Sequence, residues 1–168
     1  MKLRQMATAF IYNNNEVLMM KKKSNKIFDF EFWTAIGGHM ESSEINDPRA
    51  AVIREIAEET GLLDTELEQL ELKYILKRLK DNEIRIQYVF FGATEQREVV
   101  ESEEGELHWI EEKEVCNLKL STIVREMFKH YLKNRDLKEL NVGVITATGS
   151  DTNKFKMQWS ELKDPEIF

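Results

Sequence analysis

The stretch from residue 37 to residue 62, GGHMESSEINDPRAAVIREIAEETGL, constrains the fold of this chain more than any other. Its second half predicts a short helix over residues 48–60. Asp47 is a residue type that caps helix N-termini, Pro48 suits the first helical position, and Gly61 suits the turn that ends a helix. The sequence therefore defines both ends of this helix.

A period of about 100° per residue predicts an apolar helix face made of Ile53, Ile56, Ala57 and Thr60, with Ala50 close by. Three glutamates gather on the opposite face, at i, i+3 and i+4: Glu55, Glu58 and Glu59. These like charges repel by roughly 0.2–0.5 kcal/mol per i,i+4 pair, and Arg54 offsets part of this through Glu58. Clustered carboxylates on a rigid helix suit Mg²⁺ or Mn²⁺, and the alternative is an acidic face in solvent.

The same stretch resembles the signature of the Nudix hydrolases, in which a glycine, five residues, a glutamate and seven residues precede Arg-Glu-apolar-x-Glu-Glu-x-Gly-apolar. Gly38 and Glu44 match its opening, and residues 54–62 match its close. Nine residues rather than seven separate Glu44 from Arg54, which places two extra residues in the loop 45–47. The catalytic face is expected to survive this insertion, whereas the position of Glu44 relative to the helix is left open.

The resemblance implies an α+β Nudix fold, with a mixed β-sheet sandwiched between α-helices. Residues 1–133 would form the Nudix hydrolase domain, and residues 134–168 a C-terminal extension. It also implies metal ligands at Gly38, Glu55, Glu58 and Glu59. Arg54 would orient the glutamates, and the bound ion would be Mg²⁺, with Mn²⁺ as a second choice.

Composition favours one soluble domain, because 168 residues are enough for a substantial core and 42% of them are hydrophobic. The net charge of −7 argues against a protein that coats nucleic acid, but not against a nucleotide that arrives with its metal. The chain shows no apolar run of about 20 residues and no signal peptide, so no membrane partner is expected. A single cysteine, Cys116, fits a reducing cytoplasm.

Hydrophobic patterning predicts two hairpins, over residues 6–22 with a turn at 13–16, and over residues 70–90 with a turn at Asp81-Asn82. Near the second turn, Arg78, Lys80 and Arg85 are interpreted as solvated charges. A helix beginning at Ser121 is predicted from one apolar stripe: Ile123, Val124, Met127, Phe128, Tyr131 and Leu132.

The extension predicts a third hairpin, because residues 140–146 are rich in β-branched side chains and residues 155–159 alternate apolar with polar. A hairpin of two strands is marginal alone, so it is expected to join the sheet or meet a partner subunit. A homodimer contact is the expectation.

Candidate substrate-binding residues lie before the helix. Lys22 and Lys23 close the second strand, either as solvated charges or, as the resemblance implies, facing the substrate phosphates. Aromatic residues follow, which serve either as core or as a platform on which a nucleobase stacks: Phe28, Phe32 and Trp33. Gly37 and Gly38 allow the main chain to approach a ligand closely.

Downstream, residues 95–106 form an acidic loop that is either mobile in solvent or brings one carboxylate over the metal. Relatives with a similar Glu-Gly-Glu-Leu-x-Trp pattern supply a glutamate from this loop as metal ligand or general base. Glu103 and Glu104 are the candidates, and Glu104 is preferred because it directly precedes Gly105.

The resemblance implies hydrolysis of a phosphoanhydride in a nucleotide. The first hypothesis is a MutT-like nucleoside triphosphate pyrophosphohydrolase acting on non-standard or oxidised nucleotides such as 8-oxo-dGTP. The alternatives are an ADP-ribose or other nucleotide-sugar pyrophosphatase and, in another class, a non-catalytic nucleotide-sensing Nudix module. Sensor modules typically lose signature glutamates, which this chain keeps.

Overall fold

A computed structural model describes residues 1–22, 30–136, 138–149 and 151–166. The elements follow in this order: β1 (Lys2–Asn13), β2 (Glu16–Lys22), β3 (Phe32–Thr34), β4 (Ile36–His39), α1 (Pro48–Thr60), η1 (Asp64–Glu66), β5 (Glu68–Lys80), β6 (Glu83–Ala93), β7 (Glu106–Glu111), η2 (Glu112–Asn117), α2 (Thr122–Lys133), β8 (Leu140–Thr148) and β9 (Asp151–Leu162).

The described strands form one mixed sheet of nine, ordered β3-β2-β1-β6-β5-β8-β9, with β4 paired to β1 and β7 paired to β2. Strands β1 and β2 form the first predicted hairpin, and β5 and β6 form the second. Asp81 and Asn82 both take positive φ in that second turn, as a tight hairpin requires. Strands β1 and β6 lie parallel, so the two hairpins join into a single sheet.

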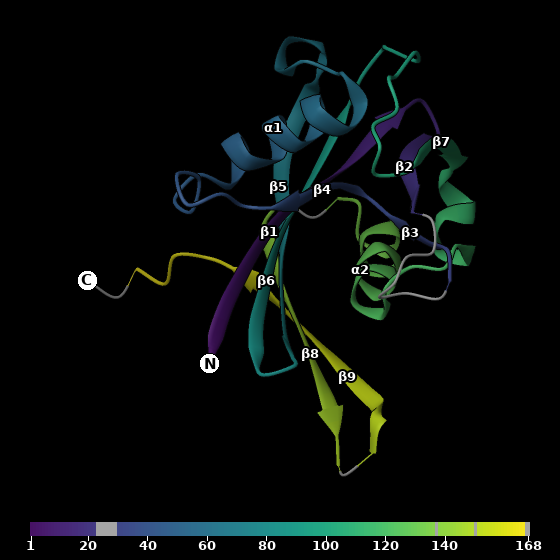
Figure 1. Cartoon of the computed structure of the whole chain (residues 1–168). Coiled ribbons are helices and arrows are strands. Elements are labelled where there is room, and N and C mark those ends of the chain that lie inside the picture. The colour runs from purple at the N-terminus through teal and green to yellow at the C-terminus, as the bar shows by residue number, and fades with distance from the viewer. Residues whose placement is uncertain (23–29, 137, 150, 167–168) are drawn as a thin grey trace.

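The two helices cover opposite faces of this sheet, which confirms the predicted α+β sandwich (Figure 1). Helix α1 buries Ala51, Val52 and Ile56 in one apolar cluster. Helix α2 buries four residues of the predicted stripe in the other cluster: Ile123, Val124, Met127 and Phe128.

The C-terminal hairpin adds to the sheet, which was one of the two possibilities that the sequence left open. Strand β8 pairs in parallel with β5, and β9 pairs antiparallel with β8. Trp159 of β9 stacks on His130 of α2, with ring centroids 4.3 Å apart. Gly143 of β8 makes room for that indole, since a Cβ there would lie 2.3 Å from Trp159. Contact with a partner subunit, and hence the homodimer, stays a prediction.

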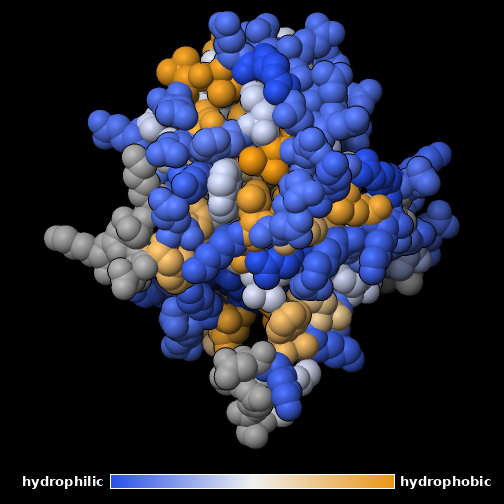
Figure 2. Space-filling view, turned by 90° about the vertical axis from the view of Figure 1, so that its right-hand side faces the viewer, coloured by the Kyte–Doolittle hydropathy of each residue, from blue (hydrophilic) through white to orange (hydrophobic). Residues whose placement is uncertain are grey.

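The side of the molecule that carries β3, β7 and α2 is mostly hydrophilic, and its hydrophobic patches are interrupted by hydrophilic residues (Figure 2). In the part of the chain that the structure describes, no helix is long and apolar enough to cross a membrane.

Candidate active site

Helix α1 has the ends that the sequence predicts. The Asp47 side chain accepts a hydrogen bond of 3.0 Å from the Ala50 N–H, and Pro48 is the first helical residue. Gly61 takes a left-handed conformation, with φ of 75°, and its N–H donates to the carbonyl of Ala57. These caps fix where the helix begins and ends, and hence the height of its glutamates above the sheet.

The predicted helix faces are wrong in part, although Ile56 and Thr60 are buried as expected. The buried residues of α1 are Ala51, Val52, Glu55, Ile56, Glu59 and Thr60, whereas Ile53 and Ala57 are half-buried. Two signature glutamates therefore point toward the sheet. Glu55 is 8% exposed and Glu59 only 2%. Glu58 remains exposed, so the three neighbouring glutamates differ in burial.

A pair of glycines in β4 makes this burial possible. The Gly37 N–H donates a hydrogen bond of 2.8 Å to Glu59 Oε2. The Glu55 carboxylate lies over Gly38, where a Cβ would meet both of its oxygens at 2.8 Å. Because neither glycine has a side chain, the buried carboxylates of α1 reach the backbone of β4.

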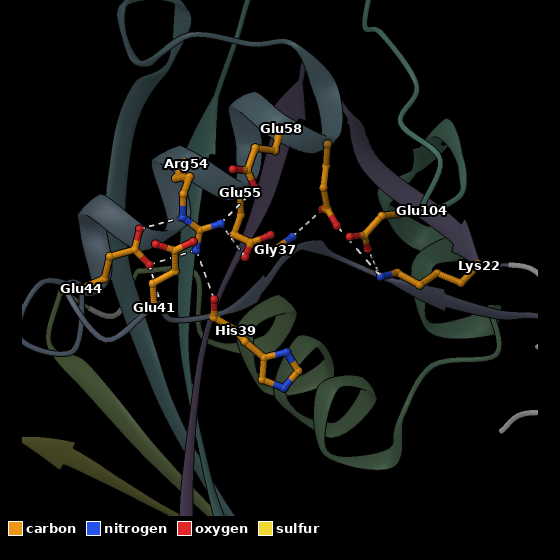
Figure 3. Close-up of polar contacts among 10 residues, drawn as sticks. Lys22, Gly37, His39, Glu41, Glu44, Arg54, Glu55, Glu58 and Glu104 are labelled. Atoms are coloured by element: carbon orange, nitrogen blue, oxygen red, sulfur yellow. Dashed lines mark hydrogen bonds and ion pairs between the residues drawn. The ribbon is translucent and has the colours of Figure 1, made fainter.

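Arg54 ties the site together, as Figure 3 shows. Its Nε donates to Glu44 Oε1 at 2.7 Å and its Nη2 to Glu44 Oε2 at 2.9 Å. Its Nη1 donates at 3.0 Å to both Glu55 and Glu58, and its Nη2 also reaches the carbonyl of His39. Arg54 contacts protein groups on every side, which fits an orienting role.

The position of Glu44, which the sequence left open, is defined by that clamp. Its carboxylate also accepts the Glu41 N–H at 2.9 Å, so the longer loop folds back onto the helix. The Arg54 hydrogen bonds lower the pKa of Glu44, and those with Glu44 raise the pKa of Arg54. The two extra residues are accommodated without separating Glu44 from the signature helix.

On the other side of the glycine pair, Lys22 joins α1 to the acidic loop. Lys22 Nζ lies 2.7 Å from Glu104 Oε2 and 4.0 Å from Glu59 Oε1. The Lys22 hydrogen bond lowers the pKa of Glu104. Burial raises the pKa of Glu59 to about 7, although the Gly37 N–H and Lys22 act to lower it. Burial also raises the pKa of Glu55.

These carboxylates fit a hard divalent cation by their chemistry. Glu55 and Glu59 are buried, and burial disfavours their charged forms, so a cation beside them would relieve an electrostatic cost. Carboxylate and carbonyl oxygens are the donors that Mg²⁺ prefers. Among the described residues, no three acidic, His or Cys side chains already converge on one point. Binding an ion would therefore require Glu58 or Glu104 to adjust its rotamer.

The sequence candidates divide into those that meet here and those that do not. The structure groups Lys22, Gly37, Gly38, Arg54, Glu55, Glu58, Glu59 and Glu104. Trp33 packs against the apolar cluster under α2, edge-on to His108 at 5.3 Å. Phe32 pairs with Lys22 across β2 and β3 and is half-buried. Lys23 and Phe28 lie outside the described residues, and Glu103 is exposed on its loop.

Sequence reasoning missed the carbonyl of His39 as a partner of Arg54. The signal was weak, because a backbone oxygen leaves no trace in the residue types. The pairing of Arg54 with Glu44 did have a signal in the sequence. Glu44 matches the glutamate at the opening of the signature, and Arg54 matches the signature arginine.

A family model described as the NUDIX domain matches residues 2–131 of the chain. A search among curated proteins returned no match. Among solved structures, the MutT protein from Bacillus halodurans superposes with a TM-score of 0.67 at 24% identity, covering 92% of this chain and 97% of that one.

Two further structures show how broad the likeness is. A NUDIX hydrolase from Nitrosomonas europaea gives a TM-score of 0.68 at 19% identity, over 86% of this chain and 80% of that one. An Ap4A hydrolase from C. elegans gives a TM-score of 0.64 at 18% identity, over 79% and 98%. At these identities the superpositions show a shared fold.

Proposed function

Since the chain belongs to the Nudix family of hydrolases, we propose that it is a Mg²⁺-dependent, MutT-like nucleoside triphosphate pyrophosphohydrolase that acts on non-standard or oxidised nucleotides such as 8-oxo-dGTP. Nudix hydrolases act on small nucleotide substrates and generally use divalent metal ions. The observation that carries the proposal is the buried pair Glu55 and Glu59, held against Gly37 and Gly38 beside Lys22 and Glu104.

Glu55 and Glu59 would hold the ion, with the Gly38 backbone and with Glu58 or Glu104 completing the oxygen set. A bound Mg²⁺ supplies charge neutralisation of the diphosphate and lowers the pKa of a water molecule. Arg54 keeps Glu55 and Glu58 in place through its two hydrogen bonds of 3.0 Å. The protein thus contributes preorganised charge, which is the main requirement of phosphoryl transfer.

Lys22 and Glu104 supply the remaining chemistry. The Lys22 ammonium, at the end of β2, would bind a phosphate oxygen. Lys22 lowers the pKa of Glu104, so that carboxylate is ionised at neutral pH and is able to accept a proton. A water oxygen attacks phosphorus, the anhydride P–O bond breaks, the water proton passes to the carboxylate, and pyrophosphate leaves. The leaving group is already stable as an anion and needs no strong general acid.

A substrate panel tests this assignment. Phosphate and pyrophosphate release would be measured for 8-oxo-dGTP, standard nucleoside triphosphates, ADP-ribose, nucleotide sugars and dinucleoside polyphosphates, each with Mg²⁺ or Mn²⁺. We expect the highest kcat/KM for non-standard triphosphates with Mg²⁺, and loss of activity in EDTA. Faster cleavage of ADP-ribose or a dinucleoside polyphosphate would reassign the substrate. An enzyme inert on the whole panel would favour the sensor module instead.

A further inference from the structure

Lys22, the last residue of β2, lies on the sheet face that carries α1. Side chains of a strand alternate between the two faces of a sheet. Leu18 and Met20 precede Lys22 at intervals of two residues, and both pack in the apolar cluster under α1. The alternation therefore places the Lys22 ammonium on the side of the signature glutamates.

Two carboxylates from different elements share this ammonium. Lys22 Nζ lies 2.7 Å from Glu104 Oε2 and 4.0 Å from Glu59 Oε1. Figure 3 shows Lys22 and Glu104 pointing toward each other beside Gly37, on the side of the site away from Arg54. The Glu59 side chain is 3% exposed, so solvent and salt screen its interactions only weakly. Lys22 is therefore the counter-ion of two carboxylates that would otherwise repel each other.

The loop before β7 holds Glu104 at this place. The Val100 N–H donates a hydrogen bond of 2.8 Å to the carbonyl of Thr60, the last residue of α1. At the other end of the loop, Gly105 lies against β2, where a Cβ would be 2.6 Å from the carbonyl oxygen of Lys21. The loop is attached to both elements, so its carboxylate stays near the helix even without the ammonium.

A divalent ion bound by Glu55 and Glu59 would compete with this ammonium. The two cations would lie within a few ångströms of each other, in a site where burial weakens solvent screening, and would repel strongly. The divalent ion carries the larger charge, so it neutralises the carboxylates more completely than Lys22 does. Once the ion is bound, the pairing of Lys22 with Glu104 is no longer needed.

We propose that Lys22 is a counter-ion that the site exchanges for the divalent ion. Lys22 pairs with Glu104 before the ion binds and separates from it afterwards, which frees the ammonium for a substrate phosphate. This inference rests on the proposed function and adds an order to it, in which the metal binds before the phosphate. Lys22 therefore lowers the affinity for the metal and raises the affinity for the substrate.

Binding of Mn²⁺ without nucleotide tests the exchange through a double-mutant cycle. Electron paramagnetic resonance of free Mn²⁺ would give the Kd of wild type, Lys22→Gln, Glu104→Gln and the double variant. A pH of about 8 lies above the pKa of about 7 to which burial raises Glu59. We expect Lys22→Gln to bind Mn²⁺ about tenfold more tightly than wild type. In the Glu104→Gln background the same substitution should gain about threefold or less, because no ion pair remains to be broken.

Lys21→Gln is the matched control. Lys21 follows Val17 and Met19, which pack in the cluster under α2, and its ammonium pairs with Glu31 at 3.1 Å. This variant removes the same charge from the opposite face of β2, so its Mn²⁺ affinity should equal that of wild type. Glu59→Gln should abolish the binding, which identifies the site that is measured. Thermal unfolding shows whether each variant is folded.

Two results of the cycle would overturn the exchange. An equal gain from Lys22→Gln in both backgrounds would show that Lys22 only repels the ion from a distance and keeps its pairing with Glu104. Unchanged or weaker Mn²⁺ binding by folded Lys22→Gln would show that the ammonium does not compete with the ion.

Steady-state kinetics on the best substrate of the panel give a second readout. Lys22→Gln should lower the Mg²⁺ concentration for half-maximal rate by about tenfold and raise the KM for the nucleotide. A disturbed site would raise both, and that result would contradict the exchange. An enzyme inert on the whole panel would refute the proposed function, whereas the Mn²⁺ cycle would still decide whether Lys22 is exchanged.

Discussion

Arg54 organises the candidate site at the scale of single residues. It donates hydrogen bonds to three carboxylates and one carbonyl, and Glu44 receives two of them. The bidentate pair with Glu44 is the strongest geometry available to an arginine and a carboxylate. The loop before α1 is therefore held to the helix by charge as well as by its backbone.

This pair predicts a specific pH dependence of stability. Arg54 lowers the pKa of Glu44, so the folded state binds its proton less readily than the unfolded state, whose pKa is about 4.3. The stabilisation is present above that unfolded pKa and is lost as pH falls through the lower folded pKa. Glu44→Gln should therefore unfold more easily than wild type at pH 7, and the difference should shrink toward pH 3. Denaturant unfolding across this range measures it; a constant difference would contradict the linkage.

The residue types of the site could be predicted from the sequence, but their exposure could not. Glutamates on a helix usually face solvent, so Glu55 and Glu59 were assigned to the face away from the core. The structure buries them because Gly37 and Gly38 leave open space in β4. That space forms between α1 and β4, so the periodicity of the helix alone could not predict it.

At the scale of elements, the site depends on how α1 meets β4. The two glycines contribute in different ways. Gly37 has φ of 134°, and a Cβ there would lie 2.2 Å from the backbone oxygen of Ala7 in β1. At Gly38 a Cβ would contact the flexible end of the Glu55 side chain.

Substituting these glycines with alanine should therefore have different effects. Gly37→Ala is expected to destabilise the fold by roughly 2–4 kcal/mol, through backbone strain and a clash with β1. Gly38→Ala is expected to keep most of the stability but to displace the Glu55 carboxylate and lose activity. Denaturant unfolding and nucleotide hydrolysis measured on both variants give the comparison. A Gly37→Ala variant as stable as wild type, or a fully active Gly38→Ala variant, would contradict the close packing of Gly37 on β1 and of Gly38 on Glu55.

The ends of elements were predictable where short signals define them. Asp47, Pro48 and Gly61 mark α1, and Asp81-Asn82 marks the second hairpin. Pairing between distant strands was not predictable, because register depends on the whole sheet. Arg4 is an example, because it meets Arg85 through a parallel pairing of two strands that are far apart in sequence.

At the scale of the whole molecule, the C-terminal hairpin widens the sheet on the side away from β4. The hydrogen bond of 2.9 Å between Tyr74 and His130, and the stacking of His130 on Trp159, join β5, α2 and β9. The family model ends at residue 131, so this attachment involves residues on both sides of that limit. The division of the chain at residues 133 and 134 stays a prediction, as does its location in the cytoplasm.

The net charge of −7 describes this molecule poorly, because the charges are unevenly distributed. Carboxylates gather around α1 and the loop before β7, whereas cations gather at the far end of the β1, β5 and β6 strands. Total composition gave no sign of this division.

The proposed catalytic metal site depends on buried Glu59. The most direct measurement is the rate of pyrophosphate release at saturating Mg²⁺ by wild type and Glu59→Gln, on the best substrate of the panel. Glu71→Gln is the matched control, since Glu71 lies on β5 with its side chain 59% exposed. We expect a loss of about a hundredfold to ten-thousandfold in kcat for Glu59→Gln and near wild-type activity for the control. A folded Glu59→Gln that hydrolyses the substrate as fast as wild type would contradict it.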